Sequence, residues 1–214
     1  GNLCLDTRCS YYDQSQEWRE AIGFCMKKDG AVCWVAPGSD RCWAVSSSDT
    51  APVLCALGAE VTLASRGGER RIPVADLFAD DGIRHLARRP DEVLSAIHLP
   101  APSAGERAAY LKLRRRGSFD FPVLGVAARV RLGTGGVVES ARVFLGGVGS
   151  RPQEARAAGE FLAGRRLADE EVVREAARLA AQVAKPLENT DFSLGWRKKV
   201  AREYAARALR ELAG

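Results

Sequence analysis

The chain has 214 residues, which is enough for one substantial domain or two small ones. Its 46% hydrophobic and 28% charged content is that of an ordinary globular protein, and no apolar run is long enough to cross a membrane. The net charge of +5 is modest, and the densest basic run, residues 114–116, has no interleaved aromatic residues, so nucleic acid is not an expected partner.

Residues 1–50 form a polar opening zone with five of the six cysteines and three of the four tryptophans. The first residues, GNLCLDTRCS, lack the basic and apolar regions of a signal peptide. A cytoplasmic location is therefore expected, where disulfides are disfavoured. Residues 16–27 are predicted to form a short helix with Trp18 and Cys25 on one face. The rest is expected to be loop, and so long a loop-rich segment needs a cross-link or a metal to be ordered.

Residues 51–116 alternate short helical and strand patterns. A helix is predicted over 51–57 and ends at Gly58. A helical turn is predicted over 74–78, a chain turn at 67–68, and strands over 61–64, 92–99 and 109–113. We interpret residues 1–116 as one unit.

Residues 117–214 show a simpler pattern, a β-hairpin followed by helices. Apolar residues of 126–132 alternate with Arg129 and Arg131, which is typical of a half-buried strand, and a glycine-rich turn leads to a second strand over 137–145. Three helices are predicted: one from Pro152 to Gly164, one capped by Asp169, and one from about Leu194 with Trp196, Val200, Tyr204 and Ala208 on one face. An antiparallel sheet covered by helices, of α+β class, is therefore expected.

The spacing of the cysteines is the most specific feature of the sequence. Cys9, Cys25, Cys33 and Cys42 are separated by 15, 7 and 8 residues, with no C-x-x-C pair among them. Structural zinc usually takes thiolates from such tight pairs, whereas a [4Fe–4S] cluster accepts single thiolates from separate loop positions. Spacing alone favours a cluster only slightly and leaves zinc open. Cys55 lies in an apolar run and is expected to be a buried free thiol.

Two tryptophans directly follow candidate ligands. The rings of Trp34 and Trp43 are expected to shield a cluster from water, which would tune its reduction potential. The alternative for both residues is ordinary loop packing.

Four stretches of the sequence resemble one known family. GNLCLDTRC, WREAIGFCMKKDGAVCWVAPGSDRCWAVSSSDTAP, YLKLRRRGSFDFPVLGVAA and VFLGGVGSRPQEA are similar to the flavin-binding subunit of 4-hydroxybenzoyl-CoA reductase, in the xanthine dehydrogenase family of molybdenum hydroxylases. The resemblance implies an α+β fold in two parts. Residues 1–116 would be the second lobe of a PCMH-type FAD-binding domain with an iron–sulfur insertion at about 4–48, and residues 117–214 a CO-dehydrogenase-flavoprotein-like C-terminal domain.

The same resemblance implies which residues hold the cofactors. In the insertion, a [4Fe–4S] cluster would be bound by Cys9, Cys25, Cys33 and Cys42, with Cys4 and Cys55 unligated. For FAD, Gly1 and Asn2 correspond to the end of a glycine-rich segment that meets the pyrophosphate, and Asp49 corresponds to an acidic residue that hydrogen-bonds FAD. Leu94 corresponds to an apolar residue near the flavin ring. Lys112 corresponds to a lysine whose charge favours the anionic reduced flavin.

Each FAD contact also has a simpler interpretation. Asp49 would be a helix N-cap, Leu94 a core residue and Lys112 an exposed strand residue. The chain is expected to correspond to the C-terminal two-thirds of the family's subunit, and so to contribute only part of the FAD cradle.

The implied function is electron transfer in the anaerobic degradation of aromatic compounds. A ferredoxin would supply electrons that pass through the [4Fe–4S] cluster and FAD to [2Fe–2S] centres on a small subunit and a molybdopterin cofactor on a large subunit, where 4-hydroxybenzoyl-CoA is reduced. No catalytic residue is expected on this chain, and His85 and His98 are interpreted as structural. Two alternatives are the FAD subunit of another hydroxylase of this family and a zinc-stabilised binding module without a redox role.

Overall fold

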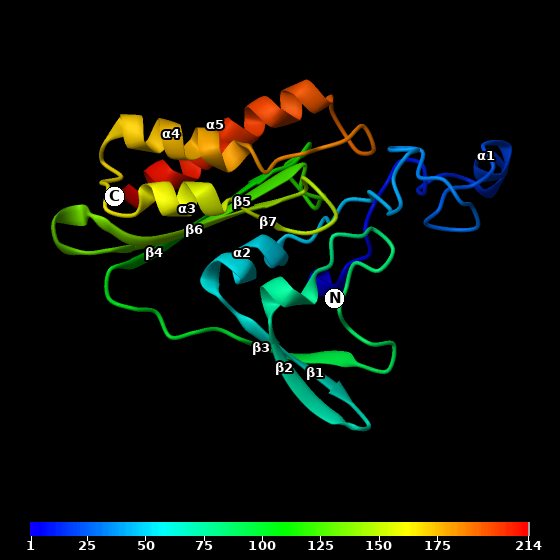
Figure 1. The fold of residues 1–214 in the computed structure, drawn as a ribbon, viewed down its shortest axis with the longest axis horizontal. Coiled ribbons are helices and arrows are strands. Elements are labelled where there is room, and N and C mark those ends of the chain that lie inside the picture. The colour runs from blue at the N-terminus through cyan, green and yellow to red at the C-terminus, as the bar shows by residue number, and fades with distance from the viewer. Residues whose placement is uncertain (214) are drawn as a thin grey trace.

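The computed structural model describes residues 1–213, and within them the strands form two antiparallel sheets (Figure 1). The smaller sheet has the order β2-β1-β3 and the larger sheet the order β4-β5-β6-β7. The strands of the smaller sheet are β1 (Glu60–Ser65), β2 (Gly68–Pro73) and β3 (Val93–His98). Those of the larger sheet are β4 (Glu106–Leu113), β5 (Leu124–Leu132), β6 (Val138–Gly146) and β7 (Gln153–Glu154).

Four short helices belong to the part of the chain before β3. They are the 3-10 helices η1 (Asn2–Cys4) and η2 (Val74–Leu77) and the α-helices α1 (Gln16–Ala21) and α2 (Thr50–Leu57). The helix α1 lies among the N-terminal loops, away from the smaller sheet (Figure 1). As predicted, α2 ends at Gly58, whose left-handed conformation (φ 71°) costs a glycine little. Cys55 on α2 lies in the hydrophobic core with Val61 and Leu63, where the sequence placed it.

Three helices cover one face of the larger sheet, α3 (Arg156–Leu162), α4 (Glu170–Ala181) and α5 (Leu194–Ala213) (Figure 1). The α4 helix begins as predicted, because the Asp169 side chain accepts a hydrogen bond from the backbone N–H of Glu171 at 2.9 Å. The alternate apolar residues of β5 that were predicted to face inward, from Val126 to Val130, lie in the core beneath these helices.

The opposite face of the larger sheet packs against α2. Ala127 of β5 and Phe144 of β6 share a core cluster with Ala51 and Cys55 of α2. Residues 124–128 of β5 are therefore buried on both faces, whereas the sequence pattern predicted a half-buried strand. This contact joins the two parts of the chain through one shared apolar layer.

The strand β4 differs from its predicted place. Residues 109–113 were assigned to the first unit, but β4 is hydrogen-bonded along its length to β5, from Glu106–Arg131 to Leu113–Leu124. In the structure the chain passes from one sheet to the other between β3 and β4. A strand pattern alone does not reveal which sheet the strand joins.

Two predicted helix bounds were wrong. Pro152 does not begin α3, because residues 153–154 pair with β6 before the helix starts. The helix α1 ends at Ala21, not at residue 27, since Gly23 and Phe24 both adopt positive φ.

The predicted face of α5 is confirmed in part. Ala208 is fully buried, and Val200 and Tyr204 pack partly buried against the core. Trp196 is 39% exposed, whereas Arg197 is 5% exposed and donates to the carbonyl oxygens of Leu187, Val123 and Gly147. No helix within residues 1–213 is long and apolar enough to cross a membrane.

Candidate functional site

Four cysteines from separate loops surround one small cavity, named here the cysteine cavity. Cys9, Cys25, Cys33 and Cys42 are each 4–6% exposed and line one small cavity of about 10 Å³. The other lining residues are Tyr11, Tyr12, Met26, Lys27, Trp34, Val35 and Ala44. The structure thus brings together the four cysteines singled out in the sequence. Cys4 and Cys55 lie elsewhere.

Turns explain how single cysteines converge without C-x-x-C pairs. The carbonyl of Cys9 accepts from the backbone N–H of Tyr12 at 2.9 Å, that of Cys25 from Lys28 at 2.9 Å, and that of Cys33 from Ala36 at 3.0 Å. Each of these cysteines therefore begins a tight turn. The left-handed residues Gly23 and Phe24 end α1 and direct the chain back toward the cavity immediately before Cys25.

Burial and backbone N–H groups act on the charge of the sulfur atoms in opposite directions. Burial raises the pKa of the Cys42 thiol to about 11 and also raises the pKa of Cys9. Backbone N–H groups point at the sulfurs, that of Ala44 at 3.4 Å from Sγ of Cys42 and those of Tyr11 and Tyr12 toward Cys9. Such donors stabilise sulfur that has lost its proton to a metal.

The donor set is that of a thiolate-ligated centre. Within the described part of the chain, no three His, Cys, Asp or Glu side chains are already grouped so as to hold a metal ion. The four thiols line one small cavity with largely apolar walls. Four thiolates around such a space are the ligands that a [4Fe–4S] cluster requires.

The two tryptophans behave differently from each other. Trp34 lines the cysteine cavity, as expected, and its indole N–H donates to the carbonyl of Phe24. Trp43 was predicted to shield the same site, but it lies outside the cavity wall. Its ring stacks beneath the guanidinium of Arg41 at 3.6 Å and its indole donates to Ser39 at 2.7 Å. Tyr11, Tyr12 and Met26 provide the cover instead.

A loop from the smaller sheet's unit closes the cysteine cavity on one side. The backbone N–H of Gly82 donates to the carbonyl of Cys42 at 2.9 Å, and Arg41 forms an ion pair with Asp80 at 3.2 Å. The carbonyl of Gly82 accepts from the side chains of Thr7 and Lys27. A methyl group on Gly82 would lie 2.7 Å from Sγ of Cys42, so only glycine fits this approach.

A second concave site lies at the N-terminal end of the chain and is named here the N-terminal groove. Gly1, Asn2 and Leu94 line it, as do Leu3, Cys4, Thr50, Arg88, Val93 and Ile97. The Asn2 side-chain oxygen accepts from the hydroxyl of Ser48 at 3.0 Å and from the backbone N–H and hydroxyl of Thr50 at 3.1 and 2.9 Å. Asn2 therefore fixes the start of α2 against the groove.

The remaining two predicted FAD contacts form a pair. Lys112 Nζ lies 2.8 Å from Oδ1 of Asp49 and donates to the carbonyl of Asp120 at 2.7 Å. Lys112 is thus not a free surface residue. Asp49 makes no side-chain capping bond to α2. The hydroxyl of Ser48 caps the helix instead, by accepting a hydrogen bond from the backbone N–H of Ala51. Asp49 adjoins the groove residue Thr50 in sequence. Burial and the charge of Asp49 raise the pKa of the neighbouring Tyr110.

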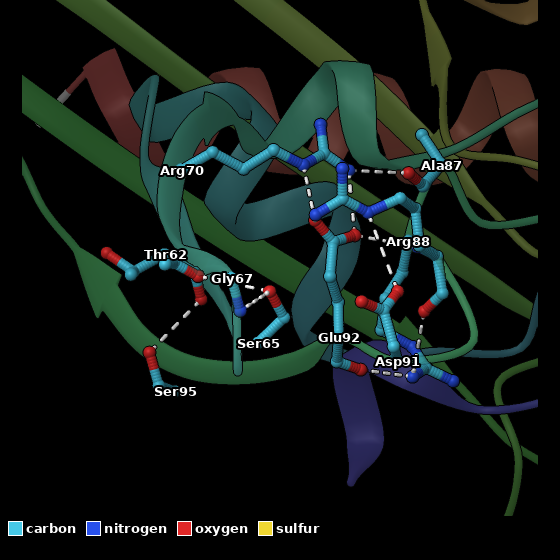
Figure 2. A network of polar contacts seen from close by, with 11 residues as sticks. Thr62, Ser65, Gly67, Arg70, Ala87, Arg88, Asp91, Glu92 and Ser95 are labelled. Atoms are coloured by element: carbon cyan, nitrogen blue, oxygen red, sulfur yellow. Dashed lines mark hydrogen bonds and ion pairs between the residues drawn. The ribbon is translucent and has the colours of Figure 1, made fainter.

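A buried carboxylate holds the wall of the N-terminal groove. Figure 2 shows Glu92 at the centre of an arginine network, with Arg70 donating to its two oxygens at 2.6 and 2.9 Å and to the carbonyl of Ala87 at 2.8 Å. Arg88 donates to the backbone carbonyl of Glu92. The network fixes residues 87–92, and thereby places Arg88 and the start of β3, with Leu94, along the groove.

Sequence reasoning missed several of these residues. Lys27, Gly82 and Arg88 were not singled out, although each contributes to one of the two sites. Lys27 lies two residues after a candidate ligand, which was the one available signal. Gly82 is 40 positions from Cys42, and no local pattern indicates that these two residues touch.

The two sheets with their helices correspond to two families that follow one another along the chain. Residues 1–102 match the family described as the FAD binding domain in molybdopterin dehydrogenase, and residues 108–212 match the CO dehydrogenase flavoprotein C-terminal domain. The two matches follow one another along nearly the whole chain. The chain therefore belongs to the family of FAD-binding subunits, or medium chains, of the xanthine dehydrogenase and CO dehydrogenase type.

Relatives and solved structures agree with this family. The chain is 35% identical over 170 residues to the aldehyde oxidoreductase FAD-binding subunit PaoB of Escherichia coli, covering 74% of this chain and 51% of PaoB. It is 30% identical to the carbon monoxide dehydrogenase medium chain of Afipia carboxidovorans, covering 76% and 54% of the two chains. CO dehydrogenase from Oligotropha carboxidovorans superposes with a TM-score of 0.70 at 28% identity, covering 78% of this chain and 57% of that one. The chain thus spans about half the length of the relatives it matches.

Proposed function

We propose that the chain is the electron-transfer subunit of a molybdenum-containing 4-hydroxybenzoyl-CoA reductase and that it holds FAD and a [4Fe–4S] cluster. Its partners are a molybdopterin-containing large subunit and a [2Fe–2S] small subunit, and a cytoplasmic ferredoxin is the electron donor. The observation that carries the proposal is the convergence of Cys9, Cys25, Cys33 and Cys42 on one enclosed cavity. When bound, the two cofactors would supply electron transfer and no bond chemistry on the substrate.

The residues of this chain hold and separate the two proposed cofactor sites. The backbones of Arg8 and Val45 exchange hydrogen bonds of 2.9 and 2.7 Å, which pairs the two ends of the cysteine-rich segment. On one side of this pair lie Cys9 and Cys42, and on the other lie Asn2 and Asp49. Short paired segments of chain therefore link the cysteine cavity to the N-terminal groove.

The proposed roles at the groove follow from charge and position. Asn2 orders the turn into α2, and Gly1, which lines the groove beside it, is proposed to meet the FAD pyrophosphate. Leu94 is proposed to pack near the flavin, and Lys112, oriented by Asp49, to supply positive charge beside it.

Substitution of the cysteines tests the ligand set. Cys25→Ser and Cys33→Ser should each abolish iron incorporation in anaerobic preparations, because each removes one of four ligands. Cys55→Ser is the matched control, since Cys55 lies in the hydrophobic core away from the cavity, and its iron content should equal that of the unmodified protein. Loss of iron in Cys55→Ser, or retention in both others, would refute the ligand assignment.

A second candidate is the FAD subunit of a hydroxylase that oxidises its substrate, because the relatives named above are an aldehyde oxidoreductase and a CO dehydrogenase. Assay of the complex with its partner subunits separates the two. Reduction of 4-hydroxybenzoyl-CoA by reduced ferredoxin supports the reductase. Turnover only of an aldehyde or a heterocycle, with an electron acceptor, supports the hydroxylase.

A further inference from the structure

A lysine ammonium is buried in the wall of the cysteine cavity. The Lys27 side chain is 6% exposed, and its Nζ donates hydrogen bonds of 2.8 Å to Oδ1 of Asp6, to the hydroxyl of Thr7 and to the carbonyl of Gly82. Lys27 lines the cavity together with the four cysteines, and its ammonium lies 5.1 Å from the centre of the Tyr12 ring. All three hydrogen-bonding positions of the ammonium are therefore occupied by groups that fix its place.

The surroundings neutralise this charge only in part. Among residues 1–213, Asp6 is the one carboxylate that Lys27 contacts, and its side chain is 57% exposed, so water screens much of its charge. Burial would raise the pKa of Asp6, but the hydrogen bond and the charge of Lys27 outweigh that effect and lower it. Nδ1 of His85 lies 3.8 Å from Oδ1 of the same carboxylate.

Burial of an ammonium is unfavourable unless its charge is used or compensated. The contacts to Thr7 and Gly82 would tie the loops together equally well through a neutral donor. The next residue, Lys28, carries the same charge on the exposed surface. The distinctive property of Lys27 is therefore a fixed positive charge on a residue that lines the same cavity as the four cysteines.

We propose that Lys27 raises the reduction potential of the group held by the four cysteines, an inference that rests on the cluster proposed above. Reduction adds one electron from an external reductant and makes the thiolate-bound group more negative by one charge. A nearby fixed cation stabilises that reduced state more than the oxidised state, and net charge is one of the factors that set the potentials of iron–sulfur centres. Lys27 is a positioning residue of the site and carries no electrons itself.

The magnitude follows from the effect of one neighbouring charge. An opposite charge within about 4–6 Å changes an ionisation equilibrium by roughly ten- to a thousandfold. We expect Lys27→Met to decrease the reduced-to-oxidised ratio at a fixed potential by at least about tenfold, which corresponds to a midpoint lowered by about 59 mV for a one-electron couple.

The test is a potentiometric titration of the anaerobically purified holoprotein, followed by electron paramagnetic resonance. Lys28→Met is the matched control, because it removes the same charge from the adjacent, exposed position. Lys27→Arg, which keeps the charge, should restore most of the potential. A midpoint for Lys27→Met equal to that of Lys28→Met, at full iron content, would overturn the inference. Absence of iron from the unmodified protein would instead refute the proposed cluster.

A second variant decides the case in which Lys27→Met fails to bind iron. Asp6→Asn removes the carboxylate that offsets the ammonium and leaves the contacts to Thr7 and Gly82 in place. Its midpoint should rise above that of the unmodified protein, opposite in direction to Lys27→Met. An unchanged or lowered midpoint in Asp6→Asn would show that Lys27 acts only as a structural tie.

Discussion

Gly82→Ala tests whether the loop of the smaller sheet's unit holds the cysteine cavity closed. A Cβ at this position would lie 2.7 Å from Sγ of Cys42, 2.7 Å from the backbone nitrogen of Ala44 and 2.8 Å from its Cβ. Favourable separations of carbon atoms are about 3.5–4.0 Å, so the loop would have to move by roughly 1 Å. None of the three contacted atoms belongs to a flexible side chain. The substitution therefore cannot be absorbed locally.

The magnitude of the effect is that of overpacking a well-filled interior, about 1–3 kcal/mol. For a chain of this size such a loss lowers the thermal midpoint by about 2–12 °C. Movement of the loop also breaks the hydrogen bond from Gly82 to the carbonyl of Cys42 and displaces the acceptor of Lys27. Iron content after anaerobic preparation should fall together with the thermal midpoint.

The assay combines thermal unfolding by circular dichroism with iron analysis. Gly38→Ala is the control, because Gly38 lies in the same cysteine-rich segment and has no atom within 4 Å of the added Cβ. Gly38→Ala should retain the midpoint and iron content of the unmodified protein. Equal midpoints and equal iron content in the two variants would refute the argument that Gly82 closes the cavity.

Three further predictions concern the flavin contacts and the second part of the chain. Lys112→Met should weaken FAD binding by about tenfold or more in a flavin-fluorescence titration, because it removes the charge paired with Asp49. Equal FAD affinities of Lys112→Met and the exposed control Lys198→Met would contradict this. The hydrogen bond from Arg129, at 2.6 Å, lowers the pKa of Glu106 from 4.5 to about 2. The stabilisation by this ion pair is therefore present above pH 4.5 and is lost as the pH falls toward 2. In urea unfolding, Glu106→Gln should have a lower free energy of unfolding than the unmodified protein at pH 7, and the difference should be much smaller at pH 2. A difference that does not change with pH would be inconsistent with the ion pair. Asp169→Ala removes the N-cap of α4 and should cost about 1 kcal/mol, or about 2–4 °C in the thermal midpoint, while the exposed control Glu160→Ala should change little.

The parts of the fold that follow local rules could be predicted from the sequence. Gly58 ends α2 because a left-handed residue favours glycine, and Asp169 begins α4 because its carboxylate satisfies a free N–H. The alternation in β5 correctly identified the face beneath the helices. Each of these signals is contained within a few residues.

Details that depend on distant partners could not be predicted in this way. Pairing with β5 decides the sheet to which β4 belongs. Arg197 of α5 is buried because distant carbonyl groups accept its hydrogen bonds. Trp43 follows a cysteine in sequence, but Arg41 and Ser39 hold its ring outside the cavity.

The candidate cysteine site shows the same division. The sequence and the family resemblance singled out the four cysteines that the structure gathers around one cavity. The side chains that complete the wall, such as Tyr11 and Met26, come from turns within the cysteine-rich segment, and the loop at Gly82 comes from a more distant part of the chain. A spacing of cysteines predicts that a site exists but not the charge placed beside it, which is why Lys27 was missed.

Metal and sulfide analysis of protein purified without oxygen tests the central claim most directly. The account predicts four iron and four acid-labile sulfide per chain, bound by the four cysteines and lost in Cys33→Ser. One zinc per chain without sulfide, or a colourless protein with four free thiols after anaerobic reconstitution, would contradict it.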